Sequence, residues 1–381
     1  MIRCCCVALI LRATPKGHNL PTQRRYVGKI ADRIIGEIGL KQHAVDVRTC
    51  VDLYNEWRHT KPFYRNAPDN GIVVNVPYVS TLTDDACSSE SPPLAVLLHG
   101  APGSFWDFSD NLIPTLRGQG VDILAPKLPN LAFSAKNTFF WHTVEERTAL
   151  LKDWLMQLGV KRIDTLVAHS AGVYPAMRII LEGVAEVKSL VLLAPNSHLS
   201  PRAVEPIWLT SRLVSAYKYP SLRPWIRPLI WTLLHIGPAP LKPVIDDVML
   251  SLITFMESRY KEGDKLLKQI AERHLPTLVI ISKNDRLLQY KTLTAVCEVL
   301  GRSEEDFWCY DDDLHLISKG TQDSWPKVVC FDKGTHFPFI RYPDICGREV
   351  VELLGRIGSL PEDSHHLTPD FESSRTETIT E

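Results

Sequence analysis

The sequence predicts an α/β protein with a doubly wound, mostly parallel central sheet flanked by helices. Short apolar runs recur along the chain without the alternation of a half-exposed strand, so both faces of these strands are expected to be buried. Segments with helical spacing separate the runs, as in repeated βαβ units. A stretch of about eighty residues between two runs is too long for a simple crossover and predicts an inserted element.

Five apolar runs carry the prediction of parallel strands. They cover residues 93–98, 121–125, 163–168, 190–194 and 277–281. Residues 144–158 have the spacing of a helix between the second and third runs. Because chemistry in such sheets gathers beyond the carboxyl ends of the strands, the loops after these runs are the first place to look for a site.

The region before the first run is predicted to hold a helix and an early strand. Val47, Val51, Tyr54 and Trp57 recur at helical spacing, so a helix is expected over residues 43–58. Residues 71–76 are rich in β-branched side chains and predict a strand, and the polar residues 83–91 predict its connecting loop.

The inserted element is expected at about residues 197–270, as a helical lid punctuated by prolines. Between positions 201 and 242 it holds six basic residues and one acid, interleaved with tryptophans and aliphatics. This composition suits contact with an anionic membrane, or a cover over an acyl chain. It equally suits helices whose tryptophans pack on the sheet while their charges face water.

The two ends of the chain differ in composition from the predicted domain over residues 36–360. Residues 1–35 form a basic leader, and its arginines without early acids predict a mitochondrial transit peptide. A secretory signal, an acylated Cys4-Cys5-Cys6 anchor and a plain basic tail are the alternatives, and without a transit peptide the chain is expected in the cytoplasm, free or at a membrane. Residues 361–381 predict a disordered acidic tail.

Composition also excludes several classes of function. The 381 residues include 43 lysines and arginines and 44 aspartates and glutamates, so the net charge of −1 gives no global attraction to nucleic acid. The apolar runs fall short of the roughly 20 residues of a membrane-spanning helix. Nine cysteines include no CxxC pair or zinc-ligand cluster, so neither a metal nor a disulfide framework is expected.

The sharpest local signal is Ala168-His169-Ser170-Ala171-Gly172, placed between an apolar run and a segment that suits a helix. A serine at such a strand-to-helix turn sits on a strained elbow and presents its hydroxyl at the sheet edge, and small neighbours leave room for the bend. The nearby helix N-terminus favours negative charge. Ser170 is therefore the candidate nucleophile.

This motif resembles the G-x-S-x-G elbow of the α/β-hydrolase superfamily, although Ala168 replaces the first glycine. In that superfamily an acid and then a histidine follow the serine. The resemblance implies Asp285, just after the run 277–281, as the acid. It implies His336 as the base, because Gly334-Thr335-His336-Phe337-Pro338 resembles the G-x-H-F-P ending of many members. A plain surface aspartate and a loop histidine without a role are the alternative interpretations.

The separation of 51 residues between these two candidates exceeds one helix and one strand. We assign the surplus to an acidic and aromatic insertion over residues 303–323, before a last strand over residues 327–331. Its triple aspartate, Asp311-Asp312-Asp313, is expected to form a solvated loop, because a cation site would need liganding spacing.

The loop His99-Gly100-Ala101-Pro102-Gly103 resembles the His-Gly loop after the third strand of these hydrolases. The resemblance implies the N–H groups of Ala101 and Ala171 as the oxyanion hole. His99 competes with His336 as a base, but the order of serine, acid and histidine fits only His336. The residues expected to support the site are His99, Gly100, Gly103, His169 and Gly172.

These residues favour a serine hydrolase that cleaves an ester or thioester of a hydrophobic, lipid-like acyl compound through an acyl-serine. Superfamily members that attack with an aspartate, the epoxide hydrolases and haloalkane dehalogenases, are disfavoured by Ser170. No metal or organic cofactor is expected. The alternatives are an amidase or peptidase of the same fold and a catalytically silent protein of this fold that binds a ligand or partner.

Overall fold

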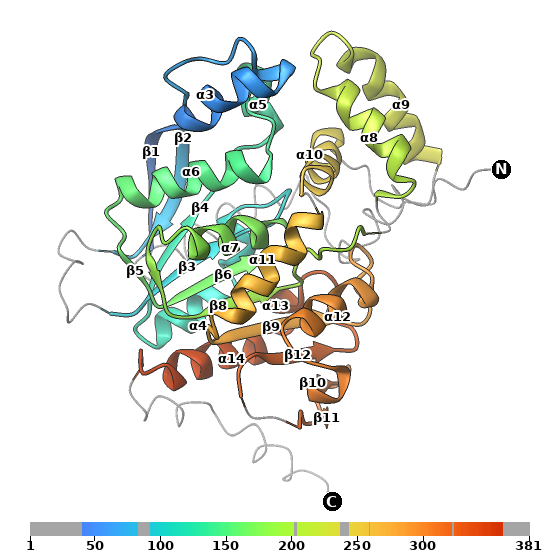
Figure 1. Cartoon of the computed structure of the whole chain (residues 1–381). Helices are drawn as coiled ribbons and strands as arrows, with labels where there is room; N and C mark the ends of the chain where they lie inside the picture. Colours follow the sequence, from blue (N-terminus) through green and yellow to red (C-terminus); the bar gives the residue numbers. More distant parts are fainter. Residues whose placement is uncertain are drawn as a thin grey trace, which may run out of the picture.

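A computed structural model describes residues 40–82, 92–201, 204–236, 244–258, 260–321 and 324–360 (Figure 1). The predicted leader, the polar loop over residues 83–91 and the predicted acidic tail lie outside these ranges. The mitochondrial location therefore stays a prediction. Within the described ranges, no helix combines the length and the apolar character needed to cross a membrane.

The central sheet has ten strands within the described residues, in the order β1-β2-β4-β3-β6-β8-β9-β12-β10-β11 (Figure 1). Neighbouring strands are parallel from β4 to β10, and β1, β2 and β11 are antiparallel at the edges. The strands are β1 Lys41–Thr49, β2 Ile72–Ser80, β3 Leu94–Leu98, β4 Asp122–Pro126, β6 Thr165–His169, β8 Leu190–Leu193, β9 Thr277–Ser282, β10 Phe307–Tyr310, β11 Leu316–Ser318 and β12 Lys327–Phe331. A small second sheet pairs β5 Arg162–Ile163 with β7 Glu186–Val187.

Helices cover both faces of this sheet, which confirms the predicted fold class. Successive residues of each parallel strand point to opposite faces, so Val96 and Leu98 join one core while Ala95 and Leu97 join the other. Helices α6, α7, α11 and α12 pack on the first face, and α4, α13 and α14 on the second. The helices are α3 Val51–Thr60, α4 Leu112–Gly118, α5 Leu131–Lys136, α6 Val144–Gln157, α7 Val173–Leu181, α8 Ile207–Tyr217, α9 Arg223–Ile236, α10 Ile245–Met256, α11 Tyr260–Glu272, α12 Tyr290–Val299, α13 Pro338–Arg341 and α14 Pro343–Arg356.

The prediction of one helix over residues 43–58 is wrong, because a strand and a helix share that segment. Residues up to Thr49 form β1, which pairs with β2 along its whole length. Cys50 then takes a left-handed conformation with φ of 61°, and α3 starts at the next residue. Val47 is buried on the strand, whereas Tyr54 and Trp57 are buried on the helix, so the apparent helical spacing spans a backbone break.

The acidic segment over residues 303–323 extends the sheet instead of forming only a loop. β10 pairs in parallel with β12, and β11 folds back on β10 as the edge strand. The aspartates lie in the turn between these two strands, where an Asp311 carboxylate oxygen accepts the N–H groups of Asp313 and His315 and Asp312 pairs with Lys333. Among the described residues, no group of three His, Cys, Asp or Glu side chains is placed to hold a metal ion.

Helices α8 to α11 occupy the segment between β8 and β9, where the inserted element is predicted. Helix α11 packs against α7 and α12, so it belongs to the layer that covers the sheet. Helices α8, α9 and α10 pack on one another beside that layer, at the upper right of Figure 1. Helix α10 also contacts α5 and reaches the loop after β3, which places it at the carboxyl edge of the sheet.

Candidate active site

Ser170 lies on a sharp turn between β6 and α7, at the carboxyl edge of the sheet. Its φ is 50°, a conformation that costs an L-residue energy and that recurs at functional elbows. The turn fits because two glycines, Gly100 and Gly172, leave room around it. A Cβ at Gly100 would come 3.0 Å from the Ser170 Cβ, and one at Gly172 would come 3.0 Å from the backbone oxygen of His99. Ala168 is buried inside β6, where its methyl group packs in the core.

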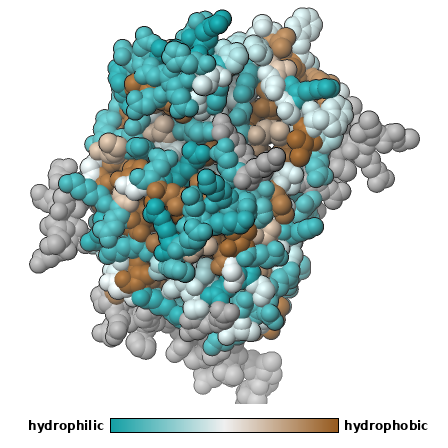
Figure 2. All heavy atoms as spheres, viewed as in Figure 1, coloured by the Kyte–Doolittle hydropathy of each residue, from teal (hydrophilic) through white to brown (hydrophobic). Residues whose placement is uncertain are grey.

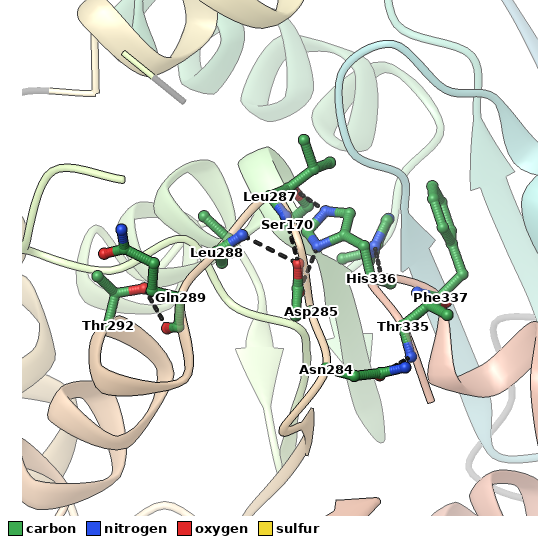
Figure 3. A network of polar contacts seen from close by, with 11 residues as sticks. Ser170, Asn284, Asp285, Leu287, Leu288, Gln289, Thr292, Thr335, His336 and Phe337 are labelled. Carbon is green, nitrogen blue, oxygen red and sulfur yellow. Dashed lines mark hydrogen bonds and ion pairs between the residues drawn. The ribbon is translucent and has the colours of Figure 1, made fainter. Parts of the chain in front are cut away.

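The structure brings together the three residues that the sequence places far apart (Figure 3). His336 Nδ1 lies 2.7 Å from Asp285 Oδ2, and His336 Nε2 lies 2.9 Å from Ser170 Oγ. Because the carboxylate accepts the Nδ1 proton, Nε2 is free to accept the hydrogen of the Ser170 hydroxyl. This is the geometry in which an imidazole can remove a proton from serine while a carboxylate steadies it.

The aspartate is held by the backbone of its own loop. Asp285 Oδ1 accepts the N–H groups of Leu287 and Leu288 at 2.8 and 2.9 Å, which leaves Oδ2 for His336. The preceding residue ties the two loops together, since Asn284 Oδ1 accepts the Thr335 N–H at 2.8 Å (Figure 3). The loop after β9 and the loop after β12 are therefore fixed to each other beside the nucleophile.

His99 contacts the backbone, and its bonds define its tautomer. The Leu128 N–H donates to His99 Nε2 at 2.9 Å, so the ring proton is on Nδ1, which donates to the Gly100 oxygen at 2.6 Å. Burial lowers the pKa of His99 to about 4, which keeps the ring neutral. Since C=O and N–H point in opposite directions across a trans peptide, anchoring this oxygen aims the Ala101 N–H away from His99.

The second predicted oxyanion donor, the N–H of Ala171, is in the first turn after Ser170. N–H groups in a first helical turn have no carbonyl of their own helix to bond. Gly103, which was expected to support this region, lets the loop fold against His99. A Cβ there would come 2.9 Å from His99 Nδ1 and 2.6 Å from an Asp107 oxygen.

His169 supports the loop that carries His336. Its Nε2 lies 3.0 Å from the backbone oxygen of His336, so this nitrogen carries the ring proton and donates it. The ring also packs against Phe337 and Phe339, with centroids 4.9 and 5.1 Å away. Burial holds the pKa of His169 well below its ordinary value, and the neutral ring adds no charge beside the nucleophile.

Arg147 is a site residue that sequence reasoning missed. It is buried at the start of α6, and its Nη1 donates to the backbone oxygen of Ala171 at 3.0 Å. An α-helix would bond that oxygen to the N–H of position 175, but position 175 is a proline and has none. Burial lowers the pKa of Arg147 to about 10, so it stays charged at neutral pH. The proline at the third position of α7 was the available signal for such a donor.

Two further residues, from the segment between β8 and β9, contact the site, and the sequence pattern did not mark either. The Ser251 hydroxyl oxygen, on α10, lies 3.1 Å from the Ala101 backbone oxygen and 3.0 Å from the Asp247 backbone oxygen, so its single proton is shared between these two acceptors. The Asn196 N–H donates to the Ser170 backbone oxygen at 3.3 Å, and the Asn196 side chain bonds the Ser258 hydroxyl at 3.0 Å. The oxyanion loop and the elbow are thus joined to the inserted helices.

A second serine and histidine are also in contact, which makes them a useful comparison. Ser134 Oγ lies 2.6 Å from His142 Nε2, and both residues are buried. Burial lowers the pKa of His142 to about 3, and no carboxylate of the described residues bonds its ring. Without an acid to stabilise an imidazolium, this pair is a poor nucleophile system.

Comparison with known proteins agrees with this architecture. A sequence model of the alpha/beta hydrolase family matches residues 95–346, more than half of the chain. No curated protein matches the sequence. A candidate lipase from Acinetobacter baumannii has a similar structure over 87% of this chain and 97% of its own, with 16% identity and a TM-score of 0.51. Haloalkane dehalogenase DbeA from Bradyrhizobium elkani is similar over 84% of this chain and 99% of its own, with 12% identity and a TM-score of 0.51. At these identities the similarity shows a common fold and gives no information about the substrate.

Proposed function

Since the chain belongs to the alpha/beta hydrolase family, we propose that it is a serine hydrolase that cleaves a carboxylic ester or thioester through an acyl-serine. The observation that carries the proposal is the hydrogen-bonded series from Ser170 through His336 to Asp285, with contacts of 2.9 and 2.7 Å. A hydroxyl, an imidazole and a carboxylate in this order activate the serine oxygen.

The reaction follows from these positions. Ser170 Oγ attacks the acyl carbon while His336 Nε2 takes its proton, and Asp285 stabilises the imidazolium. The leaving alcohol or thiol then takes that proton from His336, and an acyl-serine remains. Water attacks the acyl-serine with His336 again as base, which releases the carboxylic acid and restores Ser170.

The negative charge of the tetrahedral intermediate would be bound by the N–H groups of Ala101 and Ala171. Two bonds support this assignment, because each holds the backbone of one donor segment. His99 fixes the oxygen of the Gly100–Ala101 peptide, and Arg147 fixes the Ala171 oxygen. Donors that are already oriented need no reorganisation when the charge develops, and this is usually the largest single contribution to such catalysis.

The chemistry proposed differs from that of a dehalogenase despite the shared fold. Position 170 is a serine, whose acyl derivative water can cleave with His336 as base. The proposed substrate is a hydrophobic acyl compound, because α10 is apolar and touches the loop of Ala101 through Ser251. Apolar side chains of this helix near the reacting carbonyl would favour an aliphatic acyl group.

The test is reaction of the purified protein with a fluorophosphonate, followed by intact-mass measurement and by assays on esters of increasing chain length. Ser170→Ala should abolish the label and lower turnover by about 10³-fold or more, as removal of a triad member does elsewhere. Ser134→Ala is the matched control, since it removes the hydroxyl of the other serine–histidine contact and should leave the fluorophosphonate label in place.

Three outcomes would contradict the proposal. Wild-type turnover in Ser170→Ala would remove the nucleophile assignment. A folded wild-type chain that takes no label would instead favour a binding protein of this fold. An amide in the substrate panel separates an amidase or peptidase from an esterase, because cleavage of the amide alone would contradict the ester assignment.

A further inference from the structure

Helices α8 and α9 present a large apolar surface to solvent. We define the outer apolar face by six exposed side chains on these helices and on the residue just before α9, which are Ile207, Trp208, Leu209, Leu222, Trp225 and Leu229. Figure 2 shows pale to brown residues gathered over these helices, at the upper right. Trp225 is 80% exposed and Trp208 is 60% exposed, although tryptophan is among the costliest side chains to leave in water.

This exposure follows from the way the two helices pack. Val214, Tyr217 and Ile230 are buried, so each helix already has an inner face toward the rest of the protein. Trp225 and Leu229 are four residues apart and therefore share one face of α9, and both are exposed to solvent. A surface helix that faces water alone has polar residues on that outer side. The outer apolar face thus points to a partner.

The charges around this face favour an anionic partner. Over the described residues 204–236 the chain holds four lysines and arginines and one acid, Glu205, and Lys218 is paired with Glu257 of the neighbouring segment at 2.9 Å. The Arg212 guanidinium lies over the Trp208 ring, 5.4 Å from its centroid, and has no ion pair among the described residues. Arg227 is partly neutralised, since its Nη1 lies 2.6 Å from Asp246. Tryptophan together with arginine is the combination that lies at the boundary between lipid headgroups and acyl chains.

We propose that the outer apolar face docks on an anionic lipid surface. Trp208, Trp225 and Leu229 would enter the upper acyl region, while Arg212 meets the phosphate groups. A second copy of the chain is the other possible occupant, but that contact would bring Arg212 and Arg223 of one copy toward the same arginines of the other. The proposal goes beyond the proposed catalysis and does not depend on it, because docking requires no turnover.

Docking would also orient the site. The face is carried by α8 and α9, and α10 packs against both of these helices. The same helix places Ser251 on the backbone oxygen of Ala101. A lipid surface bound to the outer apolar face would therefore lie on the side of the molecule from which the inserted helices approach Ser170.

The test is sedimentation of the full-length chain with phosphatidylcholine vesicles that contain or lack phosphatidylserine. The variant is Trp225→Ser with Leu229→Ser. The matched control is Met156→Ser with Ile317→Ser, which removes side chains that are 61% and 55% exposed on α6 and β11. We expect the wild type and the control to bind anionic vesicles equally. The affinity of the variant should be at least about tenfold lower, because two apolar side chains that would move from water into the lipid have been removed.

Several results would overturn the proposal. These are equal binding to both kinds of vesicle, undiminished binding by the Trp225→Ser, Leu229→Ser variant, or an equal loss in the control. A dimer in sedimentation velocity that this variant dissociates, without vesicle binding by the wild type, would assign the face to a second copy. Ser170→Ala should bind vesicles as the wild type does, so a failure of the catalytic proposal and a failure of docking are distinguishable.

Discussion

The polar side chains around Ser170 are buried and bonded to other protein atoms, whereas the outer apolar face of α8 and α9 is exposed to solvent. Ser170, His336 and Asp285 are each no more than 7% exposed, and each bonds a defined protein atom, whereas Trp225 is 80% exposed. Around Ser170, one loop from each of several strands supplies one group. On the outer face, neighbouring side chains of two helices add up to an area.

This difference determines what a single substitution can do in each region. Buried hydrogen-bonded groups depend on one another, so the loss of one leaves its partner with an unmet bond in a low-dielectric environment. Exposed apolar side chains contribute area in small increments, and the folded chain without a partner loses little when one is removed. The site is therefore sensitive to geometry, and the outer face is sensitive to total area and charge.

The largest expected effect is that of Asp285→Asn. An amide cannot stabilise the imidazolium of His336 and offers the ring a different hydrogen-bonding pattern, so kcat should fall by about 10⁴-fold, as the equivalent change does in another triad enzyme. The assay is steady-state hydrolysis of the best ester found for the wild type. Asp313→Asn, at an exposed position of the β10–β11 turn, is the control and should keep wild-type kcat. A loss below tenfold in Asp285→Asn would remove this residue from the site.

The sequence predicted those site residues that a local motif marks, and missed those whose role depends on a contact between two distant segments. Ser170, Asp285 and His336 each lie shortly after a strand that an apolar run marks in the sequence. Their positions could therefore be predicted from the order of these strands along the chain. Arg147 could not, because Pro175 marks a missing donor at the elbow, but which side chain replaces it depends on how α6 packs against α7. The bond from Ser251 to Ala101 depends on how the inserted helices fold back, which no spacing encodes.

The fold was predictable where burial is symmetric. Five of the parallel strands are apolar on both faces and each appears in the sequence as a continuous apolar run, and all five runs are strands. The edges were harder. β1 is mostly exposed and carries little apolar signal, and its apolar residues merge with those of α3 at helical spacing. β10 follows a charged stretch, so its four residues were assigned only to an acidic and aromatic insertion and not to a strand.

The next largest effect concerns pH, because several site histidines are buried in the neutral form. His99 has a pKa of about 4 in the folded chain and an ordinary value of 6.5, so between these values the unfolded chain binds the extra proton. The contribution of His99 to the free energy of unfolding is fully present above pH 6.5 and decreases as the pH falls below that value. Between pH 6.5 and 5 the loss should be about 2 kcal/mol.

The measurement is denaturant unfolding of the wild type and of His99→Gln at pH steps across that window. The difference between the two chains is the quantity to follow, because burial raises the pKa of Glu146 to about 7 and of Asp107 to about 6, and these carboxyls act in the opposite direction. Relative to the variant, the wild type should lose stability as pH falls. Parallel curves would mean that His99 accepts a proton inside the fold.

The smallest effect is the most specific to how the elbow is built. Arg147→Leu removes the donor to the Ala171 oxygen and should cost about 1–3 kcal/mol of folding free energy, with a lower kcat because the oxyanion donor at Ala171 is less firmly held. Pro175→Ala restores an N–H four residues after that oxygen. If the proline is the reason for the arginine, the double variant should recover part of both losses.

A double-mutant cycle measures this dependence through denaturant unfolding and kcat of the four chains. Arg147 and Pro175 should be coupled by about 1 kcal/mol, because either the guanidinium or the new N–H can satisfy the same oxygen. Additive effects would show that Arg147 acts only through packing or charge. A coupled pair would instead show that a proline inside α7 is accepted at the elbow because another helix supplies the missing bond, a dependence of one buried group on another that the outer apolar face does not have.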